Sequence, residues 1–220
     1  MRPSGGPLYC ETGHDWLFMA EPVNTVTNIA ILFAAYFAFQ AMQKKETYPI
    51  DGVLMVFLLF ATGLGSFWWH STRDTLALTF DVLPGLLFLF LFSYLWIRKL
   101  FGMVWGLAAM GSLVGITWIL GFAIQYFEMP FLFPIFGGVT VLGIFFAYLT
   151  YKKGGTTLGR YAFGLIGIAF VAAVMRTLDL SVCEIIPFGT HFVWHLLLST
   201  AAYMAIRLLL SLDEKRMKGV

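Results

Sequence analysis

The sequence predicts an all-α protein, a bundle of seven transmembrane helices, and three observations lead to this prediction. Charged residues make up 12% of the 220 residues, against roughly 25% in soluble domains. Hydrophobic residues make up 60%, and Phe alone occurs 23 times. The apolar stretches between the charges are continuous rather than alternating, which favours helices over a transmembrane barrel.

Seven apolar runs define the expected spans, because a helix that crosses the hydrocarbon core needs about 20 apolar residues. In order they are Asn24–Gln43, Gly52–Trp69, Val82–Ile97, Leu100–Phe127, Met129–Tyr151, Tyr161–Met175 and Ile185–Ile206. The third run is short and is extended backward through Phe80, whereas the fourth can include part of a loop. The fifth begins near Pro130 and Pro134, and Arg160 and Arg176 can snorkel from the ends of the sixth.

A single membrane domain is expected over residues 1–220, with an N-terminal segment 1–23, the spans within 24–212 and a tail 213–220. The N-terminal segment has no apolar core of the kind that a cleavable signal peptide needs, so the first span is expected to act as the targeting signal. Residues 71–79 are expected to form a short outer loop.

The basic residues predict the orientation. If seven spans alternate across the membrane, one side carries three basic residues and the other side carries eleven. The three are Arg2, Arg73 and Arg176; the eleven are Lys44, Lys45, Arg98, Lys99, Lys152, Lys153, Arg160, Arg207, Lys215, Arg216 and Lys218. Because Lys and Arg are enriched in cytoplasmic loops, the N-terminus is predicted outside and the C-terminus in the cytoplasm.

Polar residues that can do chemistry gather on the predicted outer side, where eight of the 12 acidic residues and all four histidines lie. His70 closes the second span, and His191 and His195 open the seventh. Positions i and i+4 share one face of a helix, so this pair can bind zinc with His70 as a third ligand. Ser66 lies one turn before His70, and Asp81, at the start of the third span, returns to the same level.

Structural interpretations compete with this one. A single histidine near a membrane interface is more often hydrogen-bonded than metal-bound, and His14 lies in a polar segment without metal-like spacing. Cys10 and Cys183 both lie on the outer side, where they can form a disulfide or remain free thiols. Arg176 and Asp179 are expected at the outer surface, where they pair with each other or meet lipid head groups.

Four segments together resemble the alkaline ceramidases and the wider superfamily of seven-helix membrane hydrolases that includes the adiponectin-type receptors. They are Tyr9-Cys10-Glu11 with Ala20–Thr25, Gly63–Thr72, Asp81 with Pro84, and Gly189–Leu197. The sequence around Glu21 and the short loops resemble the bacterial members of the family more than the animal ones.

The resemblance implies a role for each residue of the outer cluster. The implied zinc ligands are His70, His191 and His195. Asp81 would hold the catalytic water and transfer its proton, and Ser66 would help to position or polarise the substrate carbonyl. The family also pairs cysteines at positions that match Cys10 and Cys183, which implies a disulfide between them.

The resemblance implies a second metal site as well. Animal ceramidases bind calcium in an N-terminal acidic cluster, and Glu11 and Glu21 match positions of that cluster, with Asn24 nearby. Leu8 stands where the family has Asp, and the spacing around Glu11 differs from that of the family.

The resulting hypothesis is an integral, multi-pass membrane enzyme, in the inner membrane if the source is bacterial, that uses zinc to hydrolyse the amide bond of a ceramide-like lipid. Its partners are the bilayer and a lipid substrate; a net charge of +2 without a clustered basic face gives no case for nucleic acid. The alternatives are a lipid-sensing receptor with a structural zinc and, third, a transporter. Acyl length, head group and oligomeric state do not follow from the sequence.

Overall fold

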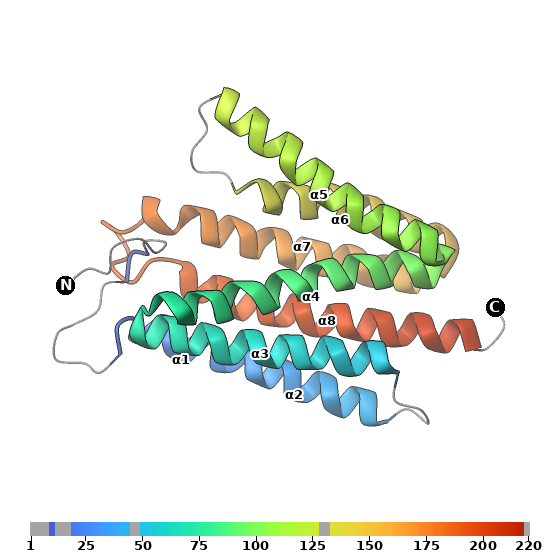
Figure 1. Ribbon diagram of the computed structural model, residues 1–220, viewed down its shortest axis with the longest axis horizontal. Helices are drawn as coiled ribbons and strands as arrows, with labels where there is room; N and C mark the ends of the chain where they lie inside the picture. Colours follow the sequence, from blue (N-terminus) through green and yellow to red (C-terminus); the bar gives the residue numbers. More distant parts are fainter. Residues whose placement is uncertain (1–8, 12–18, 45–48, 128–132, 218–220) are drawn as a thin grey trace. The chain divides into compact units, whose positions relative to one another are not determined.

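The computed structural model describes residues 9–11, 19–44, 49–127 and 133–217, and the regular structure within these ranges is entirely helical (Figure 1). The elements are α1 (Pro22–Thr27), α2 (Ile29–Gln43), α3 (Ile50–Thr72), α4 (Thr75–Phe101), α5 (Met103–Tyr126), α6 (Pro134–Gly154), α7 (Thr156–Leu178), the 3₁₀ turn η1 (Asp179–Ser181) and α8 (His191–Met217).

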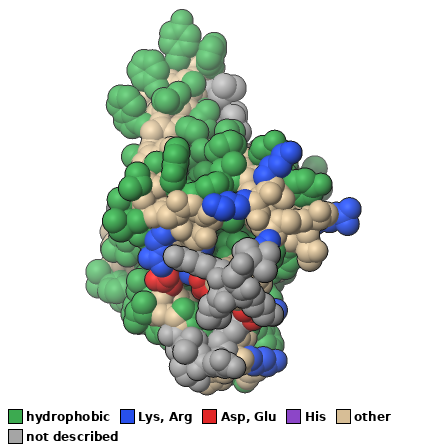
Figure 2. Space-filling view, turned by 90° about the vertical axis from the view of Figure 1, so that its right-hand side faces the viewer, with side chains coloured by type: hydrophobic (Ala, Val, Ile, Leu, Met, Phe, Trp, Pro, Cys, Tyr) green, Lys and Arg blue, Asp and Glu red, His purple; other side chains and the backbone are tan. Residues whose placement is uncertain are grey.

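Seven helices within the described ranges are long and apolar enough to cross a membrane, if α1 and α2 are counted as one. Only Asn28 separates these two, and its own backbone is helical (φ −64°, ψ −19°), so the interruption is slight. Figure 2 looks onto one end of the helices, where Lys, Arg and acidic side chains lie among hydrophobic ones. The predicted fold class is therefore confirmed.

The predicted loop between the second and third spans, residues 71–79, is wrong. Helix α3 continues to Thr72 and α4 begins at Thr75, so only two residues separate them. Arg73 ends α3 with a left-handed backbone (φ 58°), and Asp74 Oδ1 accepts the N–H groups of Leu76 and Ala77 at the start of α4. A side-chain cap of this kind satisfies helix N–H groups that lack a partner in their own helix. As a consequence, Asp81 lies well inside α4 rather than at the start of the span.

The predicted start of the last span at Ile185 is also wrong, because α8 begins at His191. The intervening segment carries Pro187, which disfavours a helical conformation at the residue before it. It also carries Gly189, whose φ of +66° is open to glycine and rare for other residues. His191 is therefore the first residue of its helix.

The chain divides into two compact units. The first comprises Met1–Phe88 and Val171–Tyr203, and it contains every candidate site residue named above that the structure describes. The second comprises Leu89–Phe170 and Met204–Val220. Its helices are joined by a hydrogen bond of 2.8 Å from the Trp96 indole to Thr150 and by a 2.5 Å ion pair between Lys99 and Asp213.

Glycine allows the closest helix contact in the first unit. A β-carbon at Gly65 of α3 would overlap the carbonyl of Phe80 and the amide of Asp81 in α4. Because these are backbone atoms, they cannot rotate aside as a side-chain end can. The contact therefore requires glycine, and it places Ser66 beside Asp81.

Candidate metal centre

Three buried histidines from two helices form one cluster. His191 and His195 occupy one face of the first turns of α8, and His70 lies near the end of α3. The ring centres are 4.5 to 5.1 Å apart, and one ligand atom from each residue lies within 4.8 Å of the others. Each side chain is at most 3% exposed. The structure thus brings together all three predicted zinc ligands.

Glu21 fixes the orientation of His70. Its Oε2 lies 2.6 Å from His70 Nδ1, and its Oε1 lies 2.7 Å from an Arg73 guanidinium nitrogen. A carboxylate can only accept, so Nδ1 of His70 carries the proton and Nε2 keeps its lone pair. Carboxylate–histidine pairs of this kind orient metal ligands in many proteins. Burial raises the pKa of Glu21 to about 7, and the Arg73 guanidinium opposes that rise.

Thr27 does the same for His195. The Thr27 hydroxyl has one proton, which points toward the carbonyl oxygens of Val23 and Asn24 at 2.9 and 3.0 Å. Its oxygen lies 3.0 Å from His195 Nδ1 and is therefore the acceptor there. His195 then holds its proton at Nδ1 and keeps the lone pair on Nε2.

His191 is held differently. Its Nδ1 is buried and has no hydrogen-bond partner in the described part of the chain. Tyr9 stacks on the imidazole with ring centres 4.1 Å apart and planes 29° apart. Burial raises the pKa of Tyr9 to about 12, so the phenol stays neutral beside the cluster.

Ser66 and Asp81 lie together beside the cluster. Ser66 is buried one turn before His70, and its hydroxyl interacts with the Asp81 carboxyl, which is half-buried. The charge of Asp81 is also felt at Tyr9, which stacks on His191. Among the described residues, only the histidines form a group that could hold a metal, so Asp81 is placed as a neighbour and not as a ligand.

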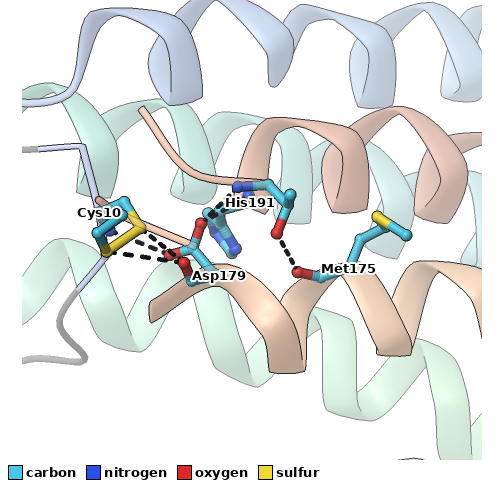
Figure 3. The surroundings of a disulfide bond; sticks show 6 residues. Cys10, Met175, Asp179 and His191 are labelled. Atoms are coloured by element: carbon cyan, nitrogen blue, oxygen red, sulfur yellow. Dashed lines mark hydrogen bonds between the residues drawn. A yellow bond between two sulfur atoms is a disulfide. The ribbon is translucent and has the colours of Figure 1, made fainter. Parts of the chain in front are cut away.

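A disulfide joins the chain before α1 to the segment between η1 and α8. Cys10 and Cys183 form a disulfide with Cα atoms 5.1 Å apart, as the resemblance implies (Figure 3). Asp179, beside it, is fully buried and accepts hydrogen bonds from the backbone N–H groups of Cys10, Thr190 and His191. The predicted surface position of Asp179 is therefore wrong. The guanidinium of Arg176 lies 4.7 Å from the centre of the Tyr9 ring.

The donor set suits zinc. Zinc is bound by imidazole nitrogens in catalytic sites that have three protein ligands and an open position for water or substrate. Two of the three rings keep the Nε2 lone pair free, and all three are shielded from solvent.

A known protein family matches the chain. The model of the family described as ceramidase matches residues 7–218. The chain belongs to the ceramidase family. No curated protein matches the chain. The match includes residues of both units and every candidate site residue, and membership of this family supports hydrolysis of ceramide in general.

The residues expected at a calcium site in this chain are close together, and both glutamates already have partners, but the side-chain oxygen of Asn24 is buried without a hydrogen-bond partner among the described residues. Glu11 accepts the N–H groups of Val23 and Asn24 at the start of α1, at 2.7 and 2.8 Å. Asn24 donates its side-chain N–H to Glu21 at 3.0 Å, and Glu21 is bonded to His70 and Arg73. Burial raises the pKa of Glu11. Leu8 and His14 lie outside the described residues. Calcium binding stays a prediction.

Sequence reasoning missed three residues that contact the histidines of the cluster: Tyr9, Thr27 and Asp179. Thr27 and Asp179 lie 168 and 12 residues from the histidines that they contact. No local spacing connects such partners. A buried carboxylate next to Gly189 is visible only once the loop before α8 is folded.

Proposed function

We propose that this ceramidase is a zinc-dependent amide hydrolase in which His70, His191 and His195 hold the metal. The observation that carries the proposal is the buried cluster itself, in which Nδ1 of His70 and of His195 is engaged by Glu21 and Thr27, so that Nε2 is left for a metal. When bound, zinc supplies Lewis acidity that activates water at neutral pH and polarises a carbonyl group.

Asp81 is the residue that moves protons in this proposal. Its carboxylate takes a proton from the attacking water while the new C–O bond forms at the amide carbon. The same oxygen then gives that proton to the departing amine nitrogen as the C–N bond breaks. The products are a free fatty acid and a sphingoid-type base. Ser66, next to Asp81, donates a hydrogen bond to the carbonyl oxygen as negative charge develops there.

The substrate class follows from the surroundings of the cluster. All three histidines belong to helices that are long and apolar enough to span a membrane, so a substrate must reach them at or within the bilayer. An N-acyl lipid carries its amide bond next to its apolar chains, which suits a site at the end of such helices. We therefore propose a ceramide-like lipid drawn from the membrane as the substrate.

Metal analysis and turnover of a fluorescent ceramide by the detergent-purified protein test the proposal. Wild-type protein should hold zinc and release labelled fatty acid, and His191→Ala should lose both. Asp81→Asn should keep the zinc and lose turnover, which separates a catalytic residue from a ligand. Wild-type protein that holds zinc but hydrolyses no N-acyl lipid would instead indicate the lipid-sensing alternative. Protein without zinc in which His191→Ala changes nothing would contradict the proposal.

A further inference from the structure

The three histidines are not oriented by the same means. His70 and His195 each have a hydrogen bond at Nδ1, to Glu21 at 2.6 Å and to Thr27 at 3.0 Å. His191 has none at this atom among the described residues, although its ring is only 3% exposed. A metal ligand normally needs such a partner, because it fixes the ring against rotation. Something else must therefore hold His191.

Asp179 holds the main chain of His191. Its Oδ1 accepts the His191 N–H at 2.9 Å and the Thr190 N–H at 2.8 Å (Figure 3). His191 is the first residue of α8, so its N–H has no partner inside the helix. The Thr190 hydroxyl also donates to the Met175 carbonyl at 2.6 Å, which ties the start of α8 to the end of α7. The Cα atom that carries the imidazole is thereby fixed from two directions.

The fit around Asp179 is tight. A β-carbon at Gly189 would overlap its Oδ1 and come within 2.7 Å of Cβ of Cys10. The carboxylate is fully buried, and its other oxygen accepts the Cys10 N–H at 3.1 Å. A buried carboxylate is costly unless it is fully hydrogen-bonded. Three N–H donors compensate for that cost, and all three belong to segments that surround His191.

Tyr9 holds the ring of His191. Its own ring stacks on the imidazole at 4.1 Å, and the neighbouring residue is Cys10, which is fixed by the disulfide and by Asp179. The guanidinium of Arg176 lies 4.7 Å from the centre of the Tyr9 ring and that of Arg73 lies 5.2 Å from it. Such cation–π contacts stabilise an aromatic ring in a defined position.

We propose that Asp179 and Tyr9 are positioning residues that orient His191 through its main chain and its ring face, in place of a hydrogen bond at Nδ1. The proposal rests on the proposed function, because it assumes that the cluster binds a metal. It assigns to both residues a role in metal affinity, although neither contributes a ligand atom to the histidine cluster.

Metal binding by the full-length protein in detergent tests this proposal without reference to activity. Zinc affinity is measured by competition with a chromophoric chelator, and cobalt substitution reports ligand geometry through its visible absorption. Asp179→Asn and Tyr9→Ala should each raise the dissociation constant for zinc about 10- to 100-fold, the range typical of outer ligand partners. Both should change the cobalt spectrum. Tyr9→Phe, which keeps the stacked ring, should restore wild-type values.

Asp213→Asn is the matched control, because it makes the same chemical change at an ion-paired carboxylate of the second unit. It should leave both readouts unchanged. If Asp179→Asn does not fold, the zinc affinities and cobalt spectra of Tyr9→Ala and Tyr9→Phe test the proposal on their own. The proposal is overturned if folded variants keep the wild-type affinity and spectrum, or if the control shifts them equally. Wild-type protein that binds neither zinc nor cobalt at the histidines would contradict the proposed function instead.

Discussion

At the residue scale, the Thr27 hydroxyl oxygen, together with the backbone of Asn24, favours the proton of His195 at Nδ1. Thr27→Val keeps the shape of the side chain and removes one acceptor beside His195 Nδ1. We expect zinc affinity to fall about 10-fold, toward the lower end of the range for such partners. Chelator competition measures the change.

Thr140→Val is the control for the Thr27 substitution. The Thr140 hydroxyl donates to the carbonyl of Phe136, four residues back in its own helix, at 2.8 Å, much as Thr27 donates to Val23. Thr140 belongs to the second unit, whereas the cluster belongs to the first. Equal losses of zinc affinity in the two variants would show that the hydroxyl acts on helix stability and not on His195.

The sequence predicts ligands more readily than it predicts what supports them. His191 and His195 can be paired from spacing alone, since positions i and i+4 share a face of any helix. Glu21 can be noticed but not assigned, because its contact with His70 spans 49 residues and depends on how α1 meets α3. Asp179 looks like a surface residue in sequence, since acidic residues are rarely buried. Only the loop before α8 shows that its charge is compensated.

At the scale of elements, the contact between α3 and α4 depends on the absence of a side chain at Gly65. Gly65→Ala would drive a methyl group into the backbone of Phe80 and Asp81. Overpacking of this kind costs about 1–3 kcal/mol, and the separation of the helices should move Ser66 away from Asp81. We expect a lower melting temperature in detergent and reduced ceramide turnover.

Gly111→Ala is the control for the Gly65 substitution, and we expect it to leave the melting temperature unchanged or slightly higher. Gly111 lies inside α5 with open space where the β-carbon would be. Because alanine is the better helix former by about 1 kcal/mol, this variant should be as stable as wild type or slightly more so. A Gly65→Ala protein with the same melting temperature as Gly111→Ala would contradict the tight contact.

Helix positions are predictable from the sequence, but helix ends are less so. The apolar runs locate all seven spans because lipid requires long uncharged segments. The runs do not reveal that α3 and α4 are joined by Arg73 and Asp74 alone, because Thr75–Phe80 reads equally well as a loop. The left-handed backbone of Arg73 and the cap by Asp74 decide that boundary, and both are local geometry rather than composition.

At the scale of the whole molecule, the disulfide connects residues 173 positions apart in sequence. It holds Cys10 where its N–H meets Asp179. Replacing both cysteines by serine should lower stability by about 2–5 kcal/mol and weaken zinc binding. Thermal unfolding with and without reductant measures the first effect. The double variant should not respond to reductant; if its melting temperature falls as far as that of the wild type, the disulfide is not the responsive group.

The orientation of the chain gives a further prediction, because two unrelated properties agree on it. Eleven of 14 basic residues lie on one predicted side of the seven spans, and positively charged loops stay in the cytoplasm. The disulfide belongs to the other side, and disulfides persist where the environment is oxidising. Both place Cys183 and the histidine cluster on the side away from the cytoplasm.

Labelling of single cysteines in intact cells tests this orientation. In a protein whose native cysteines are replaced by serine, Glu184→Cys lies in the exposed segment after α7, and Lys152→Cys lies in the exposed end of α6. A maleimide that cannot cross membranes should label Glu184→Cys directly and Lys152→Cys only after the cells are opened. The reverse pattern would place the disulfide in a reducing compartment, where it would not persist. The disulfide that holds Cys10 against Asp179 would then be lost in the cell, and with it this support of His191.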